Sequence, residues 1–190
     1  MHALFVLVAL FGTATYLGGR DLWLASSANT EPDKLTVKQV IARGVEGNPY
    51  VEVSEFVIGD NFVYEAEADR WRTVWVPIGP LEDIDKPLAS VKIVLKSNKM
   101  KSESAVAQMT NVPRLKGMII NRIESLGSSE RQILASSYPS TNPEAILILE
   151  LDRDPASMMK MGGAFFAVGI TGLLITAVVG VRQWRRTGSI

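Results

Sequence analysis

Two uncharged apolar stretches stand near the ends of the chain, at residues 3–18 and 162–181. The second is about 20 residues long, which at 1.5 Å per residue matches a hydrocarbon core of roughly 30 Å. Lys160 precedes it and Trp184 follows it, and basic and aromatic side chains are typical of the membrane interface. The pattern predicts a transmembrane helix over 158–183.

The first apolar stretch has two interpretations. Its length approaches that of the apolar part of a signal peptide, which would be cleaved. However, Met1 and His2 supply no Lys or Arg before it, and no A-x-A cleavage pattern follows closely. We therefore expect a retained transmembrane helix over 1–24. Its interfacial end would consist of Leu22, Trp23 and Leu24.

Basic residues after the second stretch predict the orientation of the chain. Arg182, Arg185 and Arg186 favour a cytoplasmic C-terminus, and two spans would return the N-terminus to the same side. The central domain would then be exoplasmic, on the periplasmic side of the inner membrane, and the lipid bilayer would be a partner. The remaining boundaries are a tether at 25–35, an exoplasmic domain at 36–157 and a basic tail at 184–190.

A stripe of small residues marks one face of the second helix. Gly172, Thr176 and Gly180 are four residues apart, so another helix can approach closely there. The first helix offers Ala14 and Gly18 as a poorer counterpart. Small residues are also common in membrane helices in general. The stripe predicts packing against the first helix, a membrane-protein partner or a second copy in a homo-oligomer.

Between the two stretches the hydrophobic pattern alternates between the periods of strands and helices. Helices are expected near 36–44, 103–109 and 129–138, two of which begin with a capping-box pattern at Thr36 and Ser129. Alternation and β-branched residues predict strands at 50–58, 62–67, 71–78, 89–95, 116–123 and 145–151.

This order of elements predicts an α+β domain. We expect a mixed or antiparallel sheet of five to six strands with about three short helices, flanked by two transmembrane helices. A curled, partly closed barrel is the alternative. Neither architecture decides the function, because both host many activities.

Composition narrows the chemistry of the domain. The chain has no cysteine and one histidine, His2, so thiolate chemistry and a Ser-His-Asp triad are excluded for its interior. Its net charge is zero, and all acidic residues lie between Asp21 and Asp154. Such a domain has no electrostatic reason to bind nucleic acid. We expect no catalytic, cofactor-binding or metal-binding residues, and no cofactor.

Aromatic residues supply the candidate interaction site. Trp71 and Trp75 share one face of the predicted third strand, and Phe62 and Tyr64 share one face of the second. An aromatic patch across this hairpin is a core in one interpretation and a docking surface in the other.

Three charged runs have a possible functional and a plain surface interpretation. The carboxylates of Glu82–Asp85 could act as acid and base or bind a hard cation, and so could Asp152 with Asp154. Each of these acidic runs is more typical of a solvated loop. A basic run could meet anionic headgroups or be ordinary charged surface. It consists of Lys92, Lys96, Lys99 and Lys101.

The run YVEVSEFVIGDNFVYEAEADRWRTVWVPIGP, with INRIESLGSSERQILASSYP and ILILELDRDP later, resembles bacterial two-pass envelope proteins of uncharacterised function that carry a W-x-x-V-W-V-P strand. In layout alone, the chain is also similar to SURF-type oxidase assembly factors and to the GIDE-type domain of a mitochondrial ubiquitin ligase. These resemblances imply an architecture and no activity.

Together these patterns favour a non-enzymatic interaction module, an accessory, assembly or scaffold protein of a membrane complex. A lipid or small-molecule binding domain at the membrane surface is the first alternative. A carboxylate-dependent hydrolase without histidine is the second.

Overall fold

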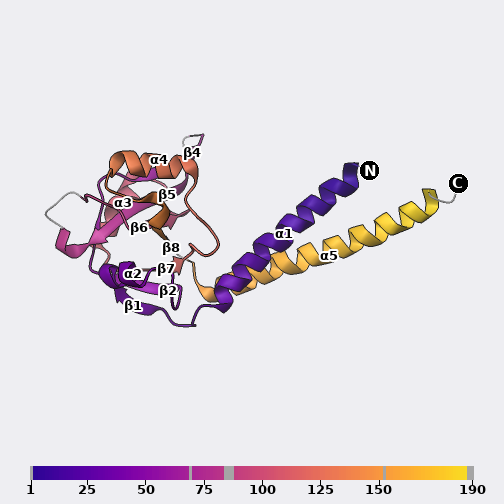
Figure 1. Cartoon of the computed structure of the whole chain (residues 1–190), viewed down its shortest axis with the longest axis horizontal. Coiled ribbons are helices and arrows are strands. Elements are labelled where there is room, and N and C mark those ends of the chain that lie inside the picture. The colour runs from indigo at the N-terminus through magenta and orange to yellow at the C-terminus, as the bar shows by residue number, and fades with distance from the viewer. Residues whose placement is uncertain (1, 69, 84–87, 152, 188–190) are drawn as a thin grey trace. The chain divides into compact units, whose positions relative to one another are not determined.

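The computed structural model describes residues 2–68, 70–83, 88–151 and 153–187, and divides the chain into two compact units. One unit consists of two long helices, α1 (His2–Ser26) and α5 (Pro155–Thr187). The other is a folded domain from Ser27 to Pro155. Figure 1 shows the elements of both.

The prediction of two transmembrane helices was wrong. Within the described part of the chain, one helix is long and apolar enough to cross a membrane, over Pro155–Arg185, with a mean hydropathy of 2.3. Only 17% of its most apolar window is buried. In α1, Arg20 and Asp21 fall inside the helix and lower its apolar character. Helix α5 thus supports membrane association, whereas a two-pass topology and its orientation have no support.

The domain contains more strands than the five to six predicted, and this prediction was also wrong. The described residues form one eight-stranded sheet in the order β1-β2-β7-β8-β6-β5-β3, with β4 paired to β5. The strands are β1 (Asp33–Thr36), β2 (Tyr50–Ser54), β3 (Phe56–Ile58), β4 (Val63–Glu67), β5 (Arg70–Pro80), β6 (Ile93–Ser97), β7 (Arg114–Ile119) and β8 (Leu147–Leu151). The short helices are α2 (Val37–Arg43), α3 (Glu103–Gln108) and α4 (Ser128–Ser137).

A break at Glu55 turns the sheet into a nearly closed barrel. Strands β2 and β3 are two halves of one stretch, which had been predicted as a single strand. The first half pairs with β7 and the second with β5. Glu55 between them has a φ of 55°. The chain bends there, so that β2 lies near one end of the strand order and β3 forms the other end. The barrel alternative is therefore closer to the fold.

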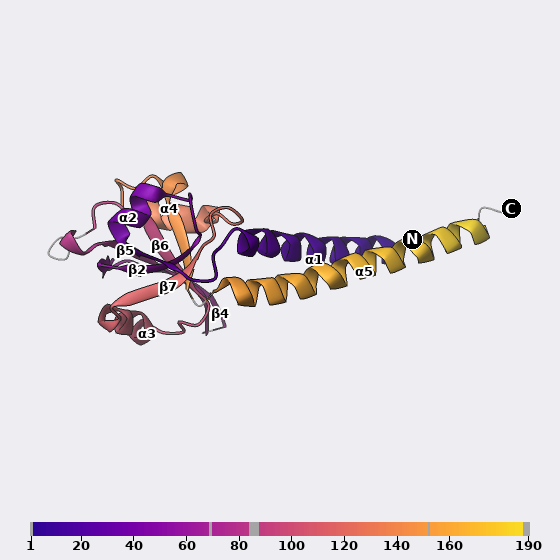
Figure 2. The same cartoon turned by 90° about the horizontal axis from the view of Figure 1, so that it is seen from below.

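The barrel interior is apolar. Val51, Val76, Ile93, Leu95 and Leu149 from four strands form one buried cluster. Helix α2 adds Val37 and Val40 to it, and α3 adds Val106. Figure 2 shows α2 and α3 on either side of the strands. Because barrel folds host many unrelated activities, the fold alone assigns no function.

Local signals explain two of the short helices. Helix α2 begins with the predicted capping box, in which the Thr36 hydroxyl accepts from the Gln39 N–H and the Gln39 side chain accepts from the Thr36 N–H. Helix α4 lacks the capping box predicted at Ser129, because its cap is Gly127, which supplies no side chain. Helix α4 lies near β4 (Figure 1).

Candidate interaction site

Three of the four predicted aromatic residues lie together on the hairpin of β4 and β5. The ring of Tyr64 stacks on that of Trp71, with 4.4 Å between centroids and 15° between planes. Phe62 lies beside both rings, at 6.4 Å from Tyr64 and 5.6 Å from Trp71. Phe62 and Trp71 also pack against the barrel core, whereas Tyr64 is 50% exposed. The aromatic cluster of Phe62, Tyr64 and Trp71 is thus part core and part surface.

Trp75 does not belong to this cluster. The pairing of β4 with β5 shifts between Glu65 and Ala66, so that β5 carries one extra residue at Arg72. Such a bulge changes the side to which later side chains point. Trp71 therefore faces the core with Val74 and Val76, while Trp75 lies on the outer face, where it is 8% exposed.

Basic side chains flank the aromatic cluster. A surface pocket of about 590 Å³ is lined by Glu67, Arg70, Trp71, Arg72 and Lys101. Glu67 pairs with Arg72 at 3.2 Å, and the Lys101 ammonium donates to the Arg72 carbonyl at 3.2 Å. Three cations therefore face one carboxylate in this basic pocket, and Trp71 connects the pocket to the aromatic cluster.

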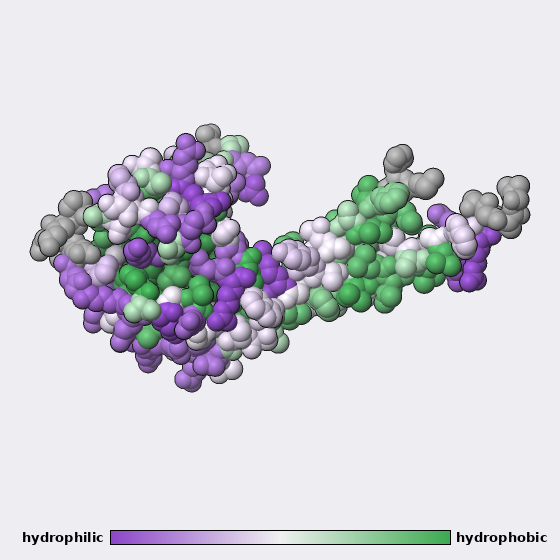
Figure 3. All heavy atoms as spheres, viewed as in Figure 1, coloured by the Kyte–Doolittle hydropathy of each residue, from purple (hydrophilic) through white to green (hydrophobic). Residues whose placement is uncertain are grey.

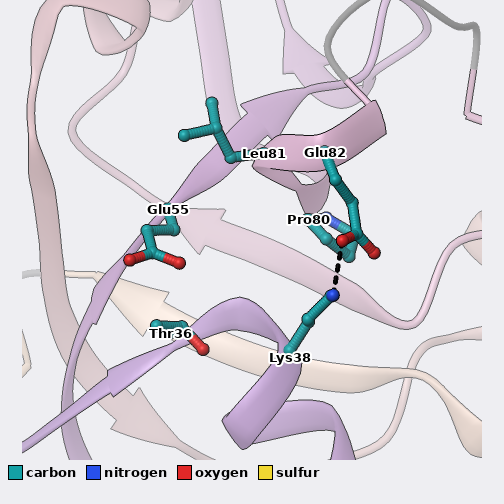
Figure 4. A pocket seen from close by; sticks show the side chains of 6 residues that line it. All are labelled: Thr36, Lys38, Glu55, Pro80, Leu81 and Glu82. Atoms are coloured by element: carbon teal, nitrogen blue, oxygen red, sulfur yellow. Dashed lines mark ion pairs between the residues drawn. The ribbon is translucent and has the colours of Figure 1, made fainter.

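A second depression, of about 280 Å³, lies where the barrel closes. It is lined by Thr36, Lys38, Glu55, Pro80, Leu81 and Glu82. Figure 4 shows Lys38 reaching Glu82, with which it forms an ion pair, beside Thr36 and Glu55. Both partners are mostly exposed, so the pair contributes little stability. With Lys38 paired to Glu82, Glu55 leaves the lining with one net negative charge, so this depression offers less to an anionic ligand than the basic pocket does.

Tyr138 fastens the end of α4 to the loop before β4. Its hydroxyl donates to the Asn61 carbonyl and accepts from the Asn61 N–H, each at 3.1 Å. The pKa of Tyr138 is raised above its ordinary value, mainly because the side chain is buried. The contact is tight, because a Cβ at Gly59 would lie 2.6 Å from the hydroxyl. The end of α4 and the loop before β4 are therefore held together.

Lys116 on β7 is a second group with a shifted pKa. Its ammonium lies 5.1 Å from the centroid of the Tyr50 ring. The hydrogen bond to Tyr50 is the main cause that raises the pKa of Lys116. The residue stays charged in water and faces outward, so this contact adds no acid or base near neutral pH.

The charged side chains that the structure describes have different surroundings. Glu82 pairs with Lys38, whereas Asp85 and Asp152 lie outside the described residues. Lys96 pairs with Glu124 and is largely buried, while Lys101 lines the basic pocket. Within the part of the chain that the structure describes, no three His, Asp or Glu side chains could hold a metal ion together.

The small-residue stripe of α5 lies partly against α1. A Cβ at Gly172 would come within 2.2 Å of the Phe11 ring, and one at Gly180 within 3.4 Å of Leu4. Thr176 is 4% exposed and its hydroxyl donates to the Gly172 carbonyl. The closest contacts with backbone atoms are elsewhere: a Cβ at Gly18 would lie 2.4 Å from the Phe166 nitrogen, and one at Gly169 would lie 2.5 Å from the Thr15 nitrogen.

Sequence reasoning missed the basic side of the site. Arg70 and Arg72 alternate with the aromatic residues along β5, but Lys101 is distant in sequence and no local pattern joins it to them. Comparison with known families, characterised proteins and solved structures gives no match. The resemblance to two-pass envelope proteins and the assembly-factor layout therefore stay predictions.

Proposed function

We propose that the protein is a membrane-associated, non-enzymatic interaction module that docks an apolar segment of a membrane-protein partner on its aromatic cluster. Helix α5 would hold the module at the membrane, as an accessory or scaffold part of a complex. Arg182 and Arg185 after the apolar span favour a cytoplasmic end for α5, which would put the domain on the other side.

One observation carries this proposal. Tyr64 is half exposed although it stacks on Trp71 and lies on a strand that, among the described residues, pairs only with β5. Large exposed aromatic groups held rigidly by their neighbours are typical of interface anchors, because little side-chain entropy is lost when they are covered.

Site-specific photocrosslinking in the native membrane tests the proposal. A benzophenone amino acid replaces Tyr64 in the full chain, and the same replacement at Ile133 on α4 is the matched control, since Ile133 is 46% exposed. We expect a discrete protein adduct from position 64 and none from position 133. The adduct should disappear when Trp71→Ala removes the ring beneath Tyr64.

Two results would contradict the proposal. Equal adducts from both positions would show nonspecific contact, and no adduct from position 64 in folded protein would leave the aromatic cluster without a partner. Near-ultraviolet circular dichroism of each variant establishes whether the domain is folded.

The second candidate function is binding of a lipid or small molecule. It is favoured by the pocket of about 590 Å³ beside the aromatic cluster. Pockets of this size hold ligands of a few hundred daltons.

A further inference from the structure

The basic pocket has the chemistry of a phosphate site. Arg70, Arg72 and Lys101 line it together with a single carboxylate, Glu67. Guanidinium groups bind phosphate oxygens in pairs, and an ammonium adds a point charge. Arg72 pairs with Glu67, and the two side chains are 60% and 71% exposed, respectively. Exposed pairs contribute little, so a phosphate can compete with Glu67 for Arg72.

The sheet topology places this pocket at the end of the barrel from which the chain continues toward α5. Strands β6 and β8 are parallel neighbours, so they end at the same end of the barrel. Lys101 follows the end of β6 at Ser97, and Pro155, where α5 begins, follows the end of β8 at Leu151. Each connection spans at most about 14 Å. The pocket therefore lies at the end of the barrel where β8 ends.

The aromatic rings beside the cations favour a lipid over a free anion. Trp and Tyr next to Arg and Lys are the combination that settles at headgroup level in membrane proteins. Each basic residue near an anionic membrane surface contributes about 1 kcal/mol of attraction, or about fivefold in affinity.

We propose that the basic pocket binds the phosphate of an anionic phospholipid headgroup. Arg70 and Arg72 hold the phosphate oxygens, Lys101 adds a third positive charge, and Trp71 covers the apolar start of the lipid chains. This inference goes beyond the docking of a protein partner and rests on the second candidate function, whose ligand class it names from the cations beside the aromatic cluster.

Short-chain lipids titrated into the full chain in a non-ionic detergent test the inference. Dihexanoyl phosphatidylglycerol is the anionic ligand, dihexanoyl phosphatidylcholine the zwitterionic one and inorganic phosphate the free anion, all followed by tryptophan fluorescence. We expect saturable binding of phosphatidylglycerol, about tenfold weaker binding of phosphatidylcholine and weaker binding still of phosphate. The signal should vanish in Trp71→Phe.

The variants separate the pocket from general charge. Arg70→Gln, Arg72→Gln and Lys101→Gln combined should weaken phosphatidylglycerol binding about 100-fold. Lys92→Gln removes an exposed cation at the other end of β6 and should change it less than about twofold. Melting curves of each variant show whether the domain remains folded.

Three outcomes would overturn the inference. Equal affinity for both lipids would remove the role of charge, and an affinity for phosphate equal to that for phosphatidylglycerol would make the pocket a free-anion site. An equal loss in Lys92→Gln would reduce the effect to net charge. None of these results depends on the crosslinking from position 64, so this inference and the docking proposal can fail separately.

Discussion

The barrel domain and the helical pair place large apolar side chains in opposite positions. In the barrel, Ile93 and Leu95 are fully buried. In the helical pair Gly18, Gly169 and Gly172 lie at the contact, whereas Leu174 on α5 is 63% exposed. Figure 3 shows apolar side chains gathered over the middle of α1 and α5. Burial of leucine away from water stabilises a domain, whereas a helix that is apolar enough to cross a membrane, as α5 is, can pack through close approach at small residues.

Removing a large side chain from each region gives the largest test of this difference. Leu95→Ala should lower the free energy of unfolding of the domain by about 3 kcal/mol, because it leaves a cavity in the barrel core. Leu174→Ala should change it by less than about 0.5 kcal/mol. Denaturant unfolding of the full chain in detergent, followed by near-ultraviolet circular dichroism, measures both. An equal loss in the two variants would remove the distinction between the regions.

The second test adds a side chain where the helices touch. Gly172→Leu would drive its side chain into the Phe11 ring, so it should weaken the packing of α1 against α5 by about 2 kcal/mol. The matched control is Gly12→Leu, since a Cβ at Gly12 meets nothing within 4 Å.

Disulfide trapping reads out this packing. The chain has no cysteine of its own, so a pair introduced by Leu4→Cys and Gly180→Cys reports only the contact of α1 with α5. Trapping should be efficient in the parent and in Gly12→Leu, and weak in Gly172→Leu. Undiminished trapping in Gly172→Leu would mean that the glycine contact does not hold the helices together.

The two regions also differed in how far the sequence predicted them. Helix α5 was evident because its apolar run is long and carries interfacial residues at both ends. The capping box at Thr36 fixed the start of α2 through two local hydrogen bonds. In contrast, the four residues of β1 contain one large apolar side chain, Leu35, and pair in parallel with a strand that is distant in sequence. Period and local chemistry carry no signal for such a strand.

The candidate site was predicted in part for a similar reason. Alternation placed Phe62 and Tyr64 together correctly, because β4 is regular up to Glu65. It placed Trp71 with Trp75 wrongly, because one extra residue at Arg72 reverses the alternation. The break at Glu55 was equally invisible, since a non-glycine residue at positive φ is set by the closure of the barrel and not by its neighbours in sequence.

A third test measures how much a partly buried hydrogen-bonded contact on the outside of the barrel contributes to stability. Tyr138→Phe removes a hydroxyl that serves both the N–H and the carbonyl of Asn61. We expect a loss of about 1.5 kcal/mol, because both backbone groups lose a partner. Thermal unfolding measures it, and Tyr16→Phe on α1 is the control, since Tyr16 is 68% exposed. A loss as large in the control would contradict the role of the contact.

The raised pKa of Tyr138 makes the stability of the domain depend on pH in the alkaline range. Burial holds the pKa of Tyr138 above its ordinary value of 10.0 in the folded chain. Above pH 10 the unfolded chain therefore loses this proton while the folded chain keeps it, so stability falls with rising pH until the raised pKa is passed. Tyr138→Phe should lack this part of the fall. Identical pH profiles from pH 8 to 11 would contradict it.

The smallest expected effect concerns backbone strain, which also distinguishes the barrel domain from the helical pair. Among the described residues, positive φ outside glycine occurs at Glu55 and Ala68, both in the barrel domain. Glu55→Gly should raise the stability of the domain by roughly 0.5 kcal/mol, because relief of the strain exceeds the added entropy of the unfolded chain. The carbonyl of residue 55 would still accept from the Leu81 N–H. Glu65→Gly, in the regular part of β4, is the control and should lower stability by a similar amount. If Glu55→Gly lowered stability more than Glu65→Gly did, the side chain of Glu55 would have to stabilise the barrel closure by more than the strain of its positive φ destabilises it. Its position beside Lys38 in the closing depression would then be the first contact to examine.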